Sequence, residues 1–133
     1  MSNYANVTID GLRNCNLDTL KEAVSKLGYD LDVADSYMKT RYGEGDDVCA
    51  KLVSRDGNTL EIGFKKVTLQ NGEYDLKLVG EFWHTGLNQQ AFMNDVRREY
   101  RVLDIKSKLE AHGYYFDFET VDEDNNVIME CYA

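Results

Sequence analysis

The sequence predicts an α+β fold in which a single antiparallel sheet carries two helices packed on one face. Two segments place apolar residues at helical spacing, and several others alternate apolar and polar residues. Asp-Gly and Asn-Gly pairs separate three of the alternating segments, as in β-hairpins. With 133 residues, 43% of them hydrophobic, the chain is expected to form one domain over residues 1–133.

The first three elements are expected to be a strand, a helix and a strand. Residues 4–9 alternate, which is typical of a short strand. The apolar stripe of the helix consists of Leu17, Leu20, Val24 and Leu27. Asn16 is a favourable N-cap, and Gly28 suits the position after the last turn. Residues 29–33 then alternate against aspartates, which predicts a strand with one solvent-facing side.

A meander of three strands should follow, at residues 48–54, 59–69 and 74–83. The turns between them read RDGN and QNGE, and both contain a pair of residues that accept positive φ. Val67 and Leu69 are out of step with the apolar residues before them in the middle strand. We therefore expect a bulge near Lys65 and Lys66.

A second helix and a closing hairpin complete the expected order. The helix should run from about Asn88 to His112, and the hairpin should occupy residues 114–133 with its turn at Asp124–Asn126. The chain contains no proline, so glycine, asparagine and aspartate must set the ends of its elements. This order fits a ferredoxin-like or a TATA-binding-protein-like arrangement.

Composition narrows the possible partners and compartment. A formal net charge of −9 disfavours nucleic acid and anionic membranes as partners, because both repel an acidic chain. Cys15, Cys49 and Cys131 are an odd, widely spaced set, which argues against a disulfide framework and a zinc site. The acidic loops lack the spacing of a calcium loop, so we expect neither a metal nor a cofactor. The first ten residues do not resemble a secretory signal, and we expect a cytoplasmic protein.

Several short motifs spread over the chain resemble one known family. They are MSNYANVTI, LDTLKEAVSKLGYDL, LEIGF, GEFW, QQAFMNDVRREYRV and HGYYFDFE. Together they look like a family of small uncharacterised proteins of cyanobacteria and plastids, encoded in plastids by a hypothetical chloroplast reading frame with a domain of unknown function. The resemblance implies an origin in photosynthetic bacteria or their viruses. It implies no activity and transfers no functional residue.

The strongest candidate site is the Trp83–His84 pair, which lies between the last meander strand and the second helix. Trp83 is out of phase with the core-facing residues of its strand, which indicates a partner surface or a ligand pocket. The alternative is that the strand ends at Phe82 and Trp83 folds back as a cap over the core. His84 has the chemistry of a general base, but no triad geometry accompanies it and a structural hydrogen bond is the more common role.

The one basic cluster, RREYR, lies on the second helix, and Arg97 and Arg101 are candidate binding residues there. A solvated, salt-bridged helix face is the ordinary interpretation. In so acidic a chain, however, these arginines are also a natural docking point for the acidic C-terminal segment of the same chain or of a second copy. Cys49 is expected to be a buried structural cysteine, and His112 to bond carbonyls at the end of its helix.

These features favour a small protein-interaction or regulatory module without catalysis, which binds a protein partner or forms a homodimer. Nine tyrosines support this, since tyrosine gives large contact area at low entropy cost. The alternative is a small-molecule-binding protein or an enzyme, in which Trp83 and His84 line a pocket together with Arg97 or Arg101.

Overall fold

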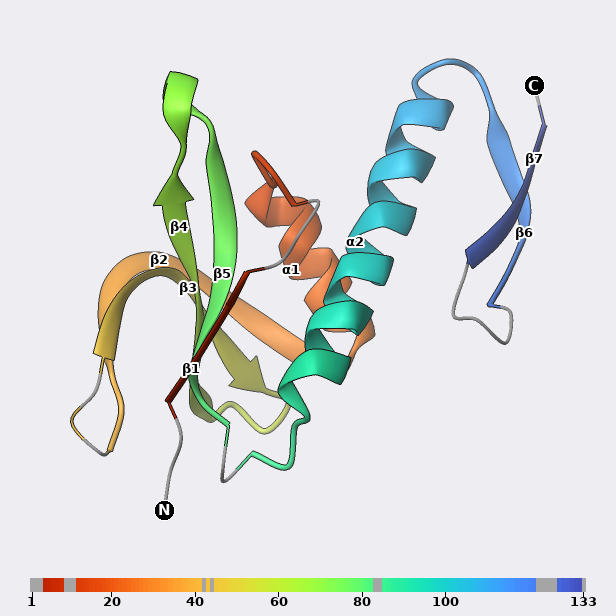
Figure 1. The fold of residues 1–133 in the computed structure, drawn as a ribbon. Helices are drawn as coiled ribbons and strands as arrows, with labels where there is room; N and C mark the ends of the chain where they lie inside the picture. The colour runs from red at the N-terminus through yellow and green to blue at the C-terminus, as the bar shows by residue number, and fades with distance from the viewer. Residues whose placement is uncertain are drawn as a thin grey trace.

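The computed structural model describes residues 4–8, 12–41, 43, 45–82, 85–121 and 127–132. Its elements, in chain order, are β1 (Tyr4–Thr8), α1 (Leu17–Lys26), β2 (Tyr29–Lys39), β3 (Gly45–Ser54), β4 (Thr59–Thr68), the 3-10 turn η1 (Gln70–Gly72), β5 (Tyr74–Glu81), α2 (Gln89–Glu110), β6 (Tyr115–Val121) and β7 (Val127–Tyr132). Figure 1 shows a curved sheet with both helices on one side of it. The predicted α+β class is confirmed.

The main sheet has five antiparallel strands in the order β1-β5-β4-β3-β2. The meander runs from β2 to β5, and β1 pairs with β5 at the far edge. Four strands, rather than two, lie between the helices, so the order is not that of a ferredoxin-like fold. Of the two expected arrangements, the TATA-binding-protein-like order is the one compatible with it.

The core lies between the sheet and the two helices. Paired residues place Leu31 with Leu52 and Phe64 with Leu78 on the helix-covered face. The buried cluster on this face joins sheet residues to α1 and α2 and consists of Leu12, Cys15, Leu20, Ala23, Val24, Leu31, Cys49, Ala50, Leu52, Ile62, Phe64, Leu76, Leu78, Phe82, Phe92, Met93, Val96 and Tyr100. A smaller cluster of Met38, Val48 and Val79 is buried apart from it.

The helices begin where their capping residues predict. The side chain of Asn16 accepts hydrogen bonds from the backbone of Asp18 and Thr19, at 2.9 and 3.1 Å. Asn88 accepts one from the backbone of Ala91 at 2.9 Å, so α2 begins at the predicted asparagine. Both caps satisfy backbone donors that the first helical turn leaves without partners.

Two details of the sheet differ from the sequence prediction. The bulge expected near Lys65 and Lys66 is wrong, because β4 pairs with β5 without interruption through both lysines. No shift is needed there, since Lys66 takes a core-facing register position and carries its ammonium out over the ring of Tyr74. The register instead shifts in β2, between Val33 and Ser36, and in the β3–β4 pairing.

The closing hairpin is the second difference. β6 and β7 form their own two-stranded sheet instead of extending the main one. In Figure 1, α2 stands between this hairpin and the main sheet. The hairpin follows the end of α2 through a short turn at Gly113, whose positive φ of 89° suits glycine. It therefore remains beside the helix, outside the main core.

Candidate functional site

The hairpin presents an exposed apolar face, formed by Tyr115, Ile128 and Tyr132 and called here the hairpin face. Tyr115 pairs with Tyr132 across the two strands, and their ring centroids are 5.7 Å apart. Ile128 lies four residues before Tyr132, so the two share a side of β7. The three residues are 61%, 49% and 45% exposed, which is unusual for an apolar cluster in a folded chain.

The two arginines predicted as binding residues lie on α2, one turn apart. Arg97 donates a hydrogen bond to the side-chain oxygen of Asn94 at 2.8 Å, and Arg101 is exposed. Neither forms an ion pair with another residue in the described part of the chain. Arg98 differs, because it pairs with Asp95 at 3.5 Å and with Glu99 at 3.4 Å. Among the described residues, the basic cluster thus divides into one neutralised arginine and two without a carboxylate partner.

Trp83 and His84 lie outside the residues that the structure describes. Their predicted roles, and the predicted pocket that they would share with Arg97 or Arg101, therefore stay predictions. The residues on either side are described. Phe82 belongs to the core, as predicted, and the side chain of Thr85 donates to the carbonyl oxygen of Phe82 at 2.8 Å.

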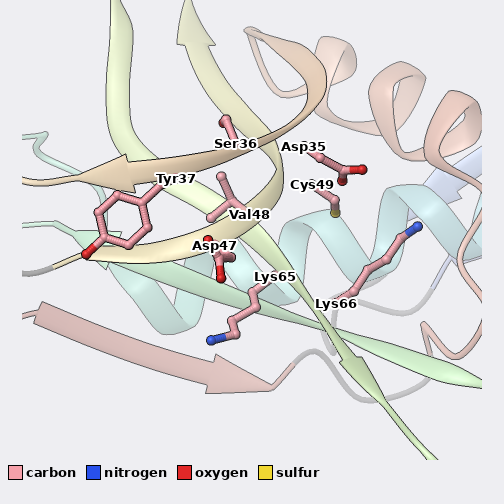
Figure 2. Close-up of a pocket in the computed structure, with 8 residues that line it drawn as sticks. All are labelled: Asp35, Ser36, Tyr37, Asp47, Val48, Cys49, Lys65 and Lys66. Carbon is pink, nitrogen blue, oxygen red and sulfur yellow. The ribbon is translucent and has the colours of Figure 1, made fainter.

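A second feature is an open pocket of about 540 Å³ on β2, β3 and β4, called here the β2–β4 pocket (Figure 2). Its lining consists of Asp35, Ser36, Tyr37, Asp47, Val48, Cys49, Lys65 and Lys66. Tyr37 pairs with Asp47 across β2 and β3. Cys49 follows Asp47 by two positions on β3, so alternation places these two side chains on one face, and Asp35 lies in the register shift of β2 opposite Cys49.

The thiol of Cys49 lies at the base of this pocket and is 4% exposed, which confirms the prediction of a buried cysteine. It donates a hydrogen bond to the carbonyl oxygen of Phe64 at 3.3 Å. Burial raises the pKa of this thiol; the nearby Lys66 ammonium opposes the rise and Asp35 adds to it. The thiol is therefore protonated at neutral pH and is not an activated nucleophile.

A buried thiol–phenol cluster joins the sheet to the helices above it. The phenol oxygen of Tyr100, on α2, accepts a hydrogen bond from the backbone of Asn16 at 2.9 Å. Tyr74, on β5, donates its phenol hydrogen to the carbonyl oxygen of Cys15. Burial raises the pKa of Cys15 to about 11 and that of Tyr100 to about 12. These groups are neutral connectors between α1, α2 and the sheet.

Sequence reasoning identified some of these positions and missed others. His112 is as predicted, since its Nδ1 lies 2.8 Å from the carbonyl oxygen of Lys108 at the end of α2. The β2–β4 pocket was missed, because the strand expected at residues 29–33 continues to Lys39. The aspartate and tyrosine of residues 35–37 were the available signal, but only the longer strand brings them opposite Asp47 and Cys49.

Among the described residues, no group of three or more histidine, cysteine, aspartate or glutamate side chains is arranged to hold a metal ion. In the same part of the chain, no helix has both the length and the apolar character required to cross a membrane.

Comparison with protein families gives one match, to a family described as "Protein of unknown function (DUF1257)", over residues 23–129. Searches against curated proteins and against solved structures gave no match. The matched range extends from α1 into β7 and so includes the β2–β4 pocket, the arginines of α2 and most of the hairpin.

Proposed function

We propose that this chain, which belongs to the DUF1257 family of proteins of unknown function, is a non-catalytic protein-interaction module that forms a homodimer through its C-terminal hairpin. The exposure of the hairpin face carries the proposal. Two tyrosines and an isoleucine, each at least 45% exposed, gather on a hairpin that lies outside the main core. Contiguous apolar surface of this kind is typical of a protein interface.

The stability expected of the hairpin also supports an interface. A two-stranded sheet is only marginally stable in water unless another element covers one of its faces. In the chain itself, the hairpin's main neighbour is α2 (Figure 1). Association would bury the hairpin face and stabilise the pairing of β6 with β7.

Charge favours a second copy of this chain as the partner. Residues 114–133 contain six acidic residues and no lysine or arginine. On α2, Arg97 and Arg101 have no carboxylate partner among the described residues. In a two-fold dimer, the acidic hairpin of each copy would lie over α2 of the other, so one surface serves both partners. Complementary charge of this kind guides association and sets its register.

The remaining expectations belong to the same proposal. The free thiols of the buried Cys15 and Cys49 agree with a reducing cytoplasm. The net charge of −9 continues to disfavour nucleic acid and membranes as partners. The expected origin in photosynthetic bacteria or their viruses rests on the sequence resemblance alone.

The test is the molar mass of the full chain over a concentration series, by light scattering after size exclusion or by sedimentation. We expect a dimer whose dissociation constant rises about tenfold or more in Tyr115→Ser, because aromatic residues dominate interface energies. Tyr37→Ser is the matched control, since Tyr37 is 60% exposed and lies on β2. Tyr37→Ser should change the dissociation constant of the dimer by no more than about twofold, because substitutions at the rim of an interface or remote from it contribute little to affinity.

A charge-reversal test distinguishes a specific contribution of Arg97 and Arg101 to the dimer from a general effect of net charge. Arg97→Glu with Arg101→Glu should weaken the dimer about tenfold, as truncated or reversed interface charges do. Lys21→Glu with Lys26→Glu makes the same change in net charge on α1 and should have little effect. A chain that stays monomeric throughout the series contradicts the homodimer. Equal weakening by both charge pairs would show that the arginines are not at the interface.

A further inference from the structure

We propose that the first half of β2, residues Tyr29–Val33 and called here the β2 edge, binds an extended basic segment of another protein as an additional strand of the main sheet. This site is independent of the proposed homodimer. β2 is the last strand of the sheet and, among the described strands, pairs with β3 alone. Alternate residues of such a strand direct their N–H and C=O groups away from the sheet, where an added strand can bond them.

The β2 edge has the regular backbone that strand addition requires. Its residues pair in register with β3, from Tyr29 opposite Ser54 to Val33 opposite Ala50. In the described part of the chain, they take part in no backbone hydrogen bond outside this ladder. The register shifts only beyond Val33, and a bulge there bends the strand, which is strongly curved in Figure 1. The β2 edge therefore offers one regular ladder that ends at the bend.

The two faces of the β2 edge differ in chemistry. Leu31 is buried in the core, and the ring of Tyr29 packs edge-on against that of Phe92, with 5.7 Å between the ring centroids. Asp30 and Asp32 alternate with them and are exposed on the opposite face. Within the described ranges, neither aspartate forms a hydrogen bond or an ion pair. An added strand would thus meet apolar side chains on one face and two carboxylates on the other.

Charge indicates which kind of strand the edge accepts. Opposite charges on neighbouring strands are stabilising, and like charges are destabilising. Lys51 lies opposite Asp32 on β3, but no ion pair joins these two side chains, so both aspartates are open to a lysine or arginine of an added strand. Val33, which shares the core-facing side with Leu31, is 42% exposed and favours an apolar neighbour. The partner segment should therefore alternate basic and apolar residues.

The same aspartates disfavour a second copy of this chain at the β2 edge. Two β2 edges side by side would gather Asp30 and Asp32 of both copies in one short ladder. The hairpin is no better suited, because residues 114–133 contain six acidic residues and no lysine or arginine. Charged side chains at an edge commonly prevent unwanted strand pairing. Here their single sign makes the rejection selective, since it excludes acidic strands and attracts basic ones.

The experiment titrates the full ¹⁵N-labelled chain with acetyl-Lys-Val-Lys-Val-Lys-Val-amide at low salt and follows amide shifts and hydrogen exchange by NMR. We expect saturable binding, with shifts concentrated at residues 29–33. Alternate amides of the β2 edge should exchange about tenfold or more slowly in the complex, because they donate to carbonyl oxygens of the peptide. The same peptide with methylated backbone nitrogens should bind about tenfold more weakly, since it keeps its charge but loses its donors.

Charge variants test the role of the two aspartates. Asp30→Asn with Asp32→Asn should weaken binding about fivefold, since two cross-strand ion pairs are lost. Glu22→Gln with Glu110→Gln removes the same charge from exposed positions on the helices and should change the dissociation constant by no more than about twofold. Asp30→Lys with Asp32→Lys should reverse the preference, so that acetyl-Glu-Val-Glu-Val-Glu-Val-amide binds instead. The amide spectra of all variants report whether they remain folded.

Three outcomes overturn the proposal. The first is the absence of saturable binding at low salt. The second is equal binding of the methylated peptide, or equal weakening by the two acid pairs, since either shows diffuse attraction to an acidic chain. The third is protection of the β2-edge amides that rises with the concentration of the free chain, which would place a second copy there. Tyr115→Ser should bind the peptide as the unchanged chain does, so failure of the dimer and failure of the β2 edge are distinguishable.

Discussion

The five-stranded sheet and the C-terminal hairpin are both antiparallel, but they keep their strands together by different means. In the main sheet, Phe64 is fully buried between paired strands and two helices. In the hairpin, the cross-strand pair Tyr115 and Tyr132 is largely exposed. The first region stabilises itself by burying apolar area, at about 25 cal/mol per Å². The second leaves comparable side chains in water, so its apolar surface is available to a partner.

The difference shows that pairing of strands and burial of side chains are separate contributions to a sheet. The hairpin has a register as well defined as that of the main sheet, apart from a shift between Phe116 and Phe118. What it lacks is a helix layer covering Tyr115, Ile128 and Tyr132. A region of this kind is expected to open locally at lower free energy than the core.

The largest difference in the free energy of unfolding should come from truncating one aromatic side chain to alanine in each region. Phe64→Ala removes a ring that is 0% exposed and should lower the free energy of unfolding by about 4 kcal/mol. Tyr115→Ala, on the hairpin face, should cost less than about 1 kcal/mol, because the ring is already in water. Urea unfolding at a concentration where the chain is monomeric measures both. Similar costs would mean that the hairpin belongs to the same cooperative core.

Two glycines offer a sharper comparison at the backbone. An added Cβ on Gly80, in β5, would lie 2.1 Å from the carbonyl oxygen of Glu61, and its φ is 138°. We expect Gly80→Ala to cost about 3 kcal/mol or more, because backbone atoms of the sheet must move. Gly113, before the hairpin, also has a positive φ but has nothing within 4 Å. Gly113→Ala should cost about 1 kcal/mol in the same unfolding measurement.

Alkaline pH should weaken the core through its buried acids. The pKa of Cys15 is raised from 9.0 to about 11, and that of Tyr100 from 10.0 to about 12. A raised folded-state pKa means that the stabilisation is complete below the unfolded pKa and is lost as pH rises through the folded one. We therefore expect unfolding to become easier by about 2 kcal/mol between pH 9 and pH 11.

Cys15→Ala and Tyr100→Phe provide the controls for this titration, followed by urea unfolding at each pH. Cys15→Ala should flatten the decline in the free energy of unfolding between pH 9 and 11. Tyr100→Phe should flatten it between pH 10 and 12. Tyr100→Phe should also cost about 1 kcal/mol at neutral pH, because the backbone N–H of Asn16 loses its acceptor. A decline of the same size in Cys15→Ala would assign the pH dependence to other groups.

Local sequence determined much of the fold. Asn16 and Asn88 set the starts of both helices because an asparagine side chain bonds backbone donors within its own turn. The Asn71–Gly72 turn has positive φ at both residues, as the dipeptide predicts. Burial of Cys49 and the bond of His112 to the end of α2 were also predicted. Each of these depends on contacts within a few residues or on a single apolar pattern.

The bulge prediction failed because alternation alone cannot recognise a lysine in a core-facing position. Lys66 occupies that register while its ammonium reaches the ring of Tyr74, eight residues away along the chain. The β2–β4 pocket was missed for a related reason. Its residues come from three strands, and only the pairing of Tyr37 with Asp47 reveals that these segments lie side by side.

By itself, the sequence determined the class of the fold, the ends of its helices and the acidic character of its C-terminal segment, since these follow from spacing, capping and charge. Tertiary structure decided that the hairpin stands apart from the main sheet and that Asp35, Tyr37 and Asp47 line one pocket. It also distinguished Arg98, which is paired, from Arg97 and Arg101. The physical reason is that a side chain's partner depends on the register and layering of distant segments, which no local pattern contains.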